Sequence, residues 1–146
     1  MQSILLIGIP ASGKSTFFQE RFADSHVRVN RDMLGTAYRH EQLMKTCVEA
    51  GIRFVSDNTN VTREVRSRTI DPAKEAGFEV VGYYFESNSV KSIILNSQRD
   101  ETYRVPDVAI YSKRSCLEYP SLSEGFDQLY FVKLCENGFD VSVWEG

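Results

Sequence analysis

The sequence predicts an α/β fold with a mostly parallel five-stranded sheet that is flanked by helices. Apolar runs bounded by turn residues alternate along the chain with amphipathic stretches, and that alternation is typical of right-handed β-α-β crossovers. The first run, from Ile4 to Ile7, is continuously apolar, as expected for a central parallel strand covered on both faces. A glycine-rich turn follows it directly. The length of 146 residues suits one compact domain, so we expect a single domain over residues 1–146.

The first half of the chain predicts three strands and three helices. After the strand at 4–7, residues 13–23 predict a helix, because Phe18 and Phe22 lie four apart on one face. A short strand is expected at 27–29, and a helix at 41–50, where Gly51 is a natural stop. Residues 52–55 predict the next strand. A helical pattern then covers 62–76, and Pro72 predicts a kink or a restart within it.

The second half continues the alternation. Residues 78–85, rich in Val and Tyr, predict a strand, and 90–97 predict a helix with three apolar residues on one face. Residues 99–105 are polar without periodicity and predict a loop. Pro106 suits the first turn of a helix that reaches about Leu117. Residues 129–134 predict a strand, and 141–144 are a candidate edge strand. Ligands of such sheets bind at the carboxyl ends of the strands, so the residues that follow each strand are the candidates for function.

Composition and charge exclude several classes of protein. The formal net charge is −3, which argues against a broad basic surface for long nucleic acids, since that affinity needs many Lys or Arg contacts to phosphates. Three widely separated cysteines show no metal-ligand spacing and suit a reducing compartment. The N-terminal apolar run is too short for a membrane span and has no basic segment before it. We therefore expect a cytoplasmic protein without a membrane partner.

The glycine-rich turn after the first strand is a phosphate-binding loop. Gly8, Gly13, Lys14 and Ser15 satisfy the pattern Gly-x4-Gly-Lys-Ser/Thr. Its backbone N–H groups and the N-terminus of the following helix bind phosphate oxygens, the lysine reaches the β- and γ-phosphates, and the hydroxyl binds Mg²⁺. A chance match in a chain of this length has odds of roughly one in two hundred at average composition. We expect the nucleotide to contact Gly8, Pro10, Ala11, Ser12, Gly13, Lys14, Ser15 and Thr16.

Two aspartates follow other predicted strands. Asp32 comes just after the strand at 27–29 and has two readings: a base that accepts the proton of a hydroxyl acceptor, or the N-cap of a helix that begins at Met33. Asp57 follows the strand at 52–55 beside the phosphate loop, where it could hold Mg²⁺ directly or through water. Asn58 and Asn60 either contact a substrate or form hydrogen bonds within the turn.

Taken together, these segments resemble a known family. The run Gly-Ile-Pro-Ala-Ser-Gly-Lys-Ser-Thr, then Asn-Arg-Asp at 30–32 and Asp-Asn-Thr-Asn at 57–60, is similar in order and rough spacing to P-loop kinases related to polynucleotide 5′-hydroxyl kinases. Residues 96–99, placed before Val105 and Pro106, resemble the lid of that family. Residues 119–127 resemble its segment before the last core strand. Relatives phosphorylate seryl-tRNA, modified bases or small molecules, so the resemblance is more specific for the superfamily than for the acceptor.

The resemblance implies a role for each matching residue. Asp32 would be the general base, and Asp57 would assist at the metal or form a hydrogen bond near the acceptor. Arg99 would be the lid arginine that closes on the transferred phosphate, with Arg104 as a second candidate. A guanidinium suits that task, because phosphoryl transfer depends mostly on electrostatic stabilisation. The lid would span about 99–105. The residues expected on the acceptor side are Arg31, Asp32, Asn58, Thr59 and Arg63.

The expected activity is transfer of the γ-phosphate of ATP, with Mg²⁺, to a hydroxyl acceptor, first of all the 5′-OH end of DNA or RNA. One alternative acceptor is a nucleoside, a modified base or a small molecule. A different alternative is an ATPase or nucleotide-dependent switch without an acceptor. In the viral polynucleotide kinase an arginine three residues after the base grips an acceptor phosphate, whereas this chain has Gly35 there. An acceptor phosphate would then be held by other arginines, for which Arg39, Arg63 and Arg66 are available.

Overall fold

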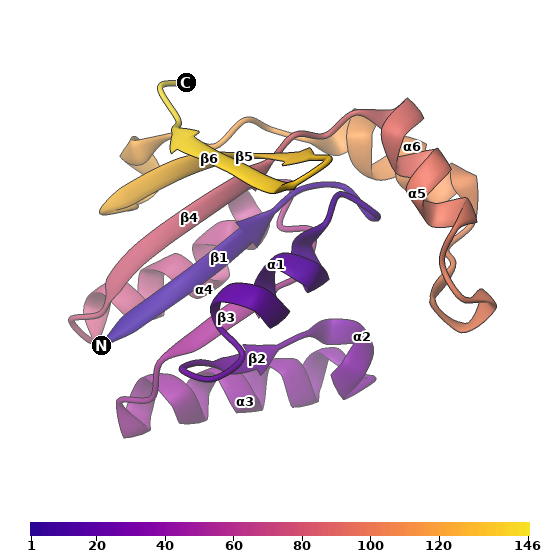
Figure 1. Ribbon diagram of the computed structural model, residues 1–146. Helices are drawn as coiled ribbons and strands as arrows, with labels where there is room; N and C mark the ends of the chain where they lie inside the picture. Colours follow the sequence, from indigo (N-terminus) through magenta and orange to yellow (C-terminus); the bar gives the residue numbers. More distant parts are fainter.

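Six strands form one sheet in the computed structural model, which describes all 146 residues. The strands are β1 (Gln2–Ile7), β2 (Val27–Val29), β3 (Phe54–Asp57), β4 (Glu79–Phe85), β5 (Gln128–Cys135) and β6 (Gly138–Val143). Their order across the sheet is β2-β3-β1-β4-β5-β6 (Figure 1). The first five are parallel, and β6 pairs with β5 in the antiparallel sense. The mostly parallel α/β fold is thus confirmed, and the candidate edge strand enlarges the expected five strands to six.

The connecting helices follow the expected order with three differences. They are α1 (Lys14–Arg21), α2 (Arg31–Leu34), α3 (Ala37–Ala50), α4 (Arg63–Glu75), α5 (Ser89–Ser97) and α6 (Asp107–Cys116), with short 3-10 turns η1 (Glu101–Tyr103) and η2 (Leu122–Glu124). Helix α2 begins at Arg31 and not at Met33, the start that the N-cap interpretation of Asp32 gave. Helix α3 begins four residues early because Thr36 caps it, its hydroxyl accepting from the amide of Arg39 at 3.2 Å. Helix α4 continues through Pro72 without the expected restart.

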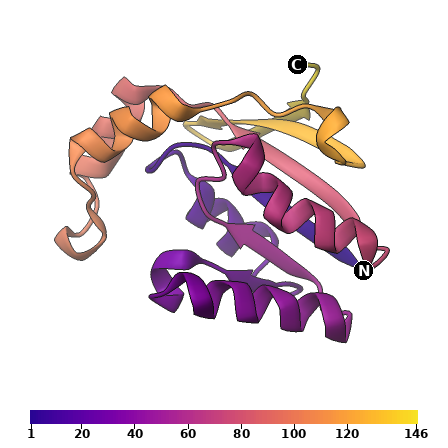
Figure 2. The same ribbon diagram turned by 180° about the vertical axis from the view of Figure 1, so that it is seen from behind.

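Two hydrophobic clusters hold helices to opposite faces of the sheet. On one face, Met44 and Cys47 of α3 and Ile70 and Ala73 of α4 pack on strand residues that include Leu5. On the other face, a second cluster joins α1 to the sheet through Phe17, Phe18, Ile4, Leu6, Val55, Val81, Phe85 and Val132. Figures 1 and 2 show this division from the two sides, with α1 in front of the sheet and α4 behind it. Burial on both faces explains why β1 reads as a continuous apolar run.

The topology places several chain segments at one edge of the sheet. Strand β1 has β3 on one side and β4 on the other, so the strands that follow β1 in the chain are added first on one side of it and then on the other. The loop after β1 therefore lies at the topological switch point, where such sheets bind ligands. The loops after β2 and β3 leave the same edge. Helices α5 and α6 and the loop between them project beyond this edge (Figure 1).

Candidate active site at the carboxyl edge of the sheet

The loop between β1 and α1 forms a nest of unpaired amides. Its first amides are anchored: that of Gly8 donates to the carbonyl of Thr59 at 2.9 Å, and that of Ile9 donates to the Ser87 hydroxyl at 3.3 Å. The amides of residues 11–16 donate to no acceptor in the protein. Gly13 permits the turn with a φ of 100°. Free N–H groups at the start of a helix bind anions, so the loop has the chemistry of a phosphate cradle.

Lys14 lies folded back into this cradle. Its Nζ donates to the carbonyl oxygens of Gly8 at 2.8 Å and Ile9 at 2.7 Å, and to the Ser12 hydroxyl at 3.3 Å. Burial lowers the pKa of Lys14 to about 8, an effect that Asp57 opposes and the positive charge of Arg99 reinforces. A buried ammonium that is satisfied only by neutral oxygens gains from a phosphate nearby. The side chain is therefore placed to bind an anion in the loop.

Ser15 and Asp57, the two expected metal ligands, share one partner. Asp57 is buried at the end of β3, and its Oδ2 accepts from Arg28 Nε at 2.7 Å. Arg28 Nη2 also donates to Ser15 Oγ at 3.1 Å. The Arg28 guanidinium thus lies between the Ser15 hydroxyl and the Asp57 carboxylate, so these two groups already bind a positively charged group. One hydroxyl and one carboxylate, completed by phosphate oxygens and water, is a ligand set that suits Mg²⁺, so these residues fit the metal.

Asp32 lies in the first turn of α2 with its side chain exposed. It makes no hydrogen bond or ion pair within the protein. The alternative reading of Asp32 as an N-cap is wrong, because Asn30 caps the helix: its Oδ1 accepts from the amide of Met33 at 2.8 Å. Asn30 Nδ2 also donates to the carbonyl of Asp57 at 2.5 Å, which ties the loop after β2 to the end of β3. The Asp32 carboxylate thus has no partner within the protein.

The loop after β3 is held mainly by its own asparagines. Asn58 Oδ1 accepts from the amide of Arg31 at 2.8 Å, and its Nδ2 lies 2.8 Å from Nε2 of His40, whose pKa is lowered by burial and by the charge of Arg31. Asn60 is buried and donates to the carbonyl of Leu6 at 2.9 Å. Asn58 therefore positions the start of α2, and Asn60 joins the loop to β1.

The arginines that follow this loop differ in their availability. Arg63 is exposed at the start of α4. Arg66 is fully buried, with Nε 2.8 Å from Glu124 Oε1 and Nη1 donating to the carbonyl of Asn60 at 2.9 Å. The expectation that Arg66 is available for an acceptor phosphate is wrong, because its guanidinium is committed to the interior. Arg31 and Arg39 are exposed near α2.

The segment between α5 and α6 is clamped at its base. The side chain of Asn96 bonds both backbone groups of Val105, with Nδ2 donating to the carbonyl at 2.6 Å and Oδ1 accepting from the amide at 3.0 Å. Residues 99–105 contain the turn η1 and not only irregular loop. Arg99 is half-buried, burial lowers its pKa, and its charge is felt at Lys14. Arg104 Nε donates to the carbonyl of Arg99 at 2.8 Å.

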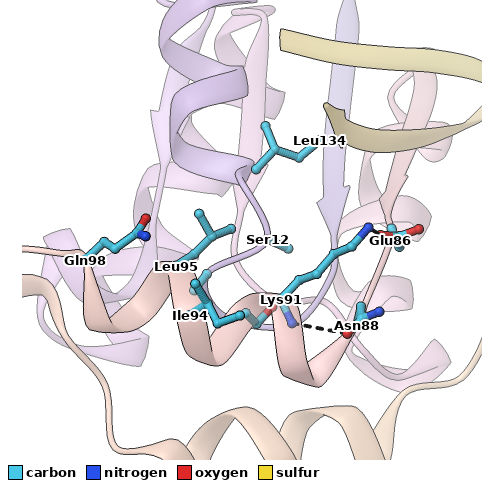
Figure 3. A pocket seen from close by; sticks show the side chains of 10 residues that line it. Ser12, Glu86, Asn88, Lys91, Ile94, Leu95, Gln98 and Leu134 are labelled. Carbon is cyan, nitrogen blue, oxygen red and sulfur yellow. Dashed lines mark hydrogen bonds and ion pairs between the residues drawn. The ribbon is translucent and has the colours of Figure 1, made fainter. Parts of the chain in front are cut away.

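A cavity of about 270 Å³ lies between the cradle and α5. Its walls include Ala11 of the loop. Figure 3 shows Ser12 from the loop, Leu95 and Gln98 from α5 and its C-cap, and Leu134 from β5 around the cavity. Lys91 lines it as well, with Nζ held by Glu86 Oε1 at 2.8 Å. Apolar walls with a few polar groups are typical of small-molecule sites.

Two residues of the site were not predicted from the sequence. Arg28 contacts both expected metal ligands, and Asn96 joins the end of α5 to Val105. The sequence did carry one signal for Arg28, because a charged residue in the middle of the strand pattern Val-Arg-Val indicates a polar partner nearby. For Asn96 the sequence carries no local signal, because its partner lies nine residues away in the chain.

Comparisons with known proteins agree on the fold. The profile of a family described as AAA domain matches residues 4–110. A bifunctional polynucleotide phosphatase/kinase of Schizosaccharomyces pombe is 31% identical over 84% of this chain, which spans only 31% of that protein's length.

Solved structures show the same architecture. Kti12 of Chaetomium thermophilum, in complex with ADP-AlF3, superposes with a TM-score of 0.68 at 15% identity and covers 92% of both chains. A sugar kinase of a Janibacter species superposes with a TM-score of 0.70 at 12% identity, over 91% of this chain and 85% of its own.

None of the helices in the structure has both the length and the apolar character that a membrane span requires.

Proposed function

Because the chain belongs to the AAA-domain family of P-loop proteins, we propose that it transfers the γ-phosphate of ATP to a hydroxyl group. The observation that carries this proposal is the pairing of two features at one sheet edge. One is the amide cradle with Lys14, and the other is the exposed, unpaired carboxylate of Asp32. A nucleotide switch needs the first feature only. A free carboxylate after another strand at the same edge of the sheet suits a phosphotransferase, which must also accept a proton from its substrate.

On the donor side, the amides of residues 11–16 and the Lys14 ammonium would hold the phosphates. Ser15 and Asp57 would hold Mg²⁺. When bound, the metal would neutralise charge on the phosphate oxygens. The cavity beside Leu95 and Leu134 offers apolar walls for the flat face of a purine base. This placement supports a purine triphosphate as the donor.

On the acceptor side, Asp32 would accept the proton of the attacking hydroxyl. The hydroxyl oxygen then forms a bond to the γ-phosphorus while the bond to the bridging oxygen breaks, and ADP leaves with that electron pair. Arg99 would stabilise the charge that spreads over the transferred oxygens, since its positive charge already lowers the pKa of Lys14. Asn58, which holds the amide of Arg31, would position the helix turn that carries the base.

The acceptor proposed is the 5′-OH end of DNA or RNA. Support comes from the 31% identity to the polynucleotide phosphatase/kinase over 84% of this chain, whereas the sugar kinase shares only 12% of its residues with it. Arg31, whose amide Asn58 holds, and Arg63, which starts α4, are both exposed and could meet the phosphates that follow a 5′ end. Arg39 is exposed one turn into α3 and adds a third positive charge.

A transfer assay tests the proposal. The chain is incubated with ATP labelled at the γ-phosphate, MgCl₂ and a panel of 5′-OH oligonucleotides of DNA and RNA, 5′-phosphorylated controls, nucleosides and tRNA. We expect label on the 5′-OH oligonucleotides and none on the 5′-phosphorylated ones. Label on nucleosides or tRNA alone would replace the polynucleotide acceptor with a smaller or different one. Release of free phosphate that no acceptor changes would refute the phosphotransferase.

A further inference from the structure

The guanidinium of Arg28 occupies the position expected for the metal. From the middle of β2 its guanidinium reaches both proposed Mg²⁺ ligands, with Nε 2.7 Å from Asp57 Oδ2 and Nη2 3.1 Å from Ser15 Oγ. We propose that Arg28 occupies the cation position between Ser15 and Asp57 until Mg²⁺ and nucleotide displace it, so that this residue sets the Mg²⁺ concentration at which nucleotide binds. The inference rests on the proposed function in assigning Mg²⁺ to these two ligands.

The environment of Asp57 explains why a cation must be present. Only 2% of its surface is exposed, and Arg28 is the one cationic partner of its carboxylate. A buried carboxylate without a counter-charge is costly, so the folded chain needs positive charge at this point before any metal arrives. Arg28 supplies that charge from within the chain.

Arg28 and Mg²⁺ would compete for the same two residues. The ion binds oxygen ligands at about 2.0–2.1 Å, and its two proposed protein ligands, Ser15 and Asp57, now accept N–H groups of Arg28. A guanidinium and a divalent cation on these same two residues would lie side by side and repel each other. Binding of the metal is therefore an exchange, in which one positive group leaves as a doubly charged ion enters.

The side chain of Arg28 is also free to leave. It is 30% exposed, whereas the carboxylate it pairs with is buried. Its guanidinium carbon lies 5.6 Å from the centre of the Phe18 ring, on the helix that starts at the phosphate cradle. A displaced guanidinium thus stays tethered beside α1, next to the site of the phosphates, and remains a source of positive charge there.

The test measures Mg²⁺ dependence without turnover. Binding of a fluorescent ADP analogue to the full chain is titrated over MgCl₂ concentrations from micromolar to millimolar, and thermal unfolding is followed with MgCl₂ alone. The variants are Arg28→Gln, Arg28→Lys and the matched control Arg53→Gln, which alters an exposed arginine just before β3. We expect the Mg²⁺ concentration for half-maximal binding to fall about tenfold in Arg28→Gln. It should fall less in Arg28→Lys and not at all in Arg53→Gln.

With MgCl₂ alone, the unfolding midpoint of Arg28→Gln should rise more than that of the wild type, because the metal replaces the missing charge on Asp57. Equal Mg²⁺ requirements in Arg28→Gln and wild type, with equal thermal responses, would overturn the role of Arg28. If Arg28→Gln does not fold, Arg28→Lys decides the question by the same two measurements. Failure of the wild type to bind nucleotide at any Mg²⁺ concentration would instead refute the proposed function, and the thermal response would still test Arg28.

Discussion

The guanidinium of Arg66 lies buried against the carboxylate of Glu124, with Nε 2.8 Å from Oε1 and Nη2 3.2 Å from Oε2. The pair joins α4 to the turn η2, which precedes β5. Glu124 Oε2 also accepts from the amide of Ser121 at 2.9 Å, and Arg66 holds the carbonyl of Asn60. Because Asn60 bonds in turn to the end of β1, this ion pair supports the loop that anchors the phosphate cradle.

Removing the charge of Glu124 should therefore destabilise the fold. We expect Glu124→Gln to lower the free energy of unfolding by about 3 kcal/mol, because it leaves a buried guanidinium without its counter-charge. Urea denaturation measures the change. The matched control is Lys74→Gln, which breaks the half-exposed pair with Asp127 and should cost no more than about 1 kcal/mol. Similar losses in the two variants would contradict the structural role of the buried pair.

The lowered pKa of Lys14 predicts how nucleotide binding depends on pH. Phosphates favour the charged ammonium, whose pKa is about 8 in the free protein. Below that pH the lysine is charged before and after binding, so the affinity is constant. Above it, binding must take up a proton, and the dissociation constant should rise about tenfold per pH unit.

Equilibrium binding of an ADP analogue between about pH 7 and pH 9.5 tests this slope, because the range brackets the pKa of Lys14 at one pH unit or more on each side. Lys14→Gln is the reference: it should bind more weakly at every pH and lack the slope, which separates the lysine from other titrating groups. A wild-type affinity that stays flat across this range would show that Lys14 does not titrate there.

Most of the fold could be predicted because its signals are local. The continuous apolar run of β1, the glycines around Lys14 and the amphipathic spacing of α3 to α6 each depend on neighbours in the chain. The family resemblance was found from the same kind of signal and is confirmed by the family match over residues 4–110. Helix α2 was expected only as one alternative, with a start at Met33, since its four residues are too few to show a period.

The contacts that complete the site could not be predicted, because they join residues far apart in the chain. Asn30 and Asp32 are both good capping residues, and only the path of the chain out of β2 decides that Asn30 caps. Arginines are ordinarily exposed, yet Arg66 is buried by a partner 58 positions away. Arg28 likewise meets Asp57 across 29 positions. Such pairs depend on strand order, which the pattern of one sequence does not specify.

The two arginines of the loop between α5 and α6 should differ in their effect on the rate of phosphate transfer. Arg99→Ala should lower the rate of phosphate transfer by about 10² to 10³ while nucleotide affinity changes little, because the proposed contact forms with the transferred phosphate. Arg104→Ala is the matched control. Its side chain is exposed and bonds only to the carbonyl of Arg99, so its rate should stay within a few-fold of wild type. Single-turnover transfer measures both, and equal losses would remove the special role of Arg99.

The role of Asp32 gives the sharpest prediction on the chemical step. Asp32→Asn keeps the shape of the side chain but cannot accept the proton of the hydroxyl, so transfer should fall by about 10² to 10⁴. Nucleotide affinity and the free energy of unfolding should stay close to wild type, because Asp32 is exposed, its side chain makes no hydrogen bond or ion pair, and it does not cap α2.

Asp24→Asn, which alters an exposed aspartate in the turn after α1, is the matched control and should leave all three quantities unchanged. Single-turnover transfer with labelled ATP, equilibrium binding and urea denaturation make the comparison. If Asp32→Asn transfers phosphate at nearly the wild-type rate, another group takes the proton. If it instead weakens nucleotide binding in parallel with the rate, Asp32 acts in holding the donor and the acceptor pocket lies elsewhere.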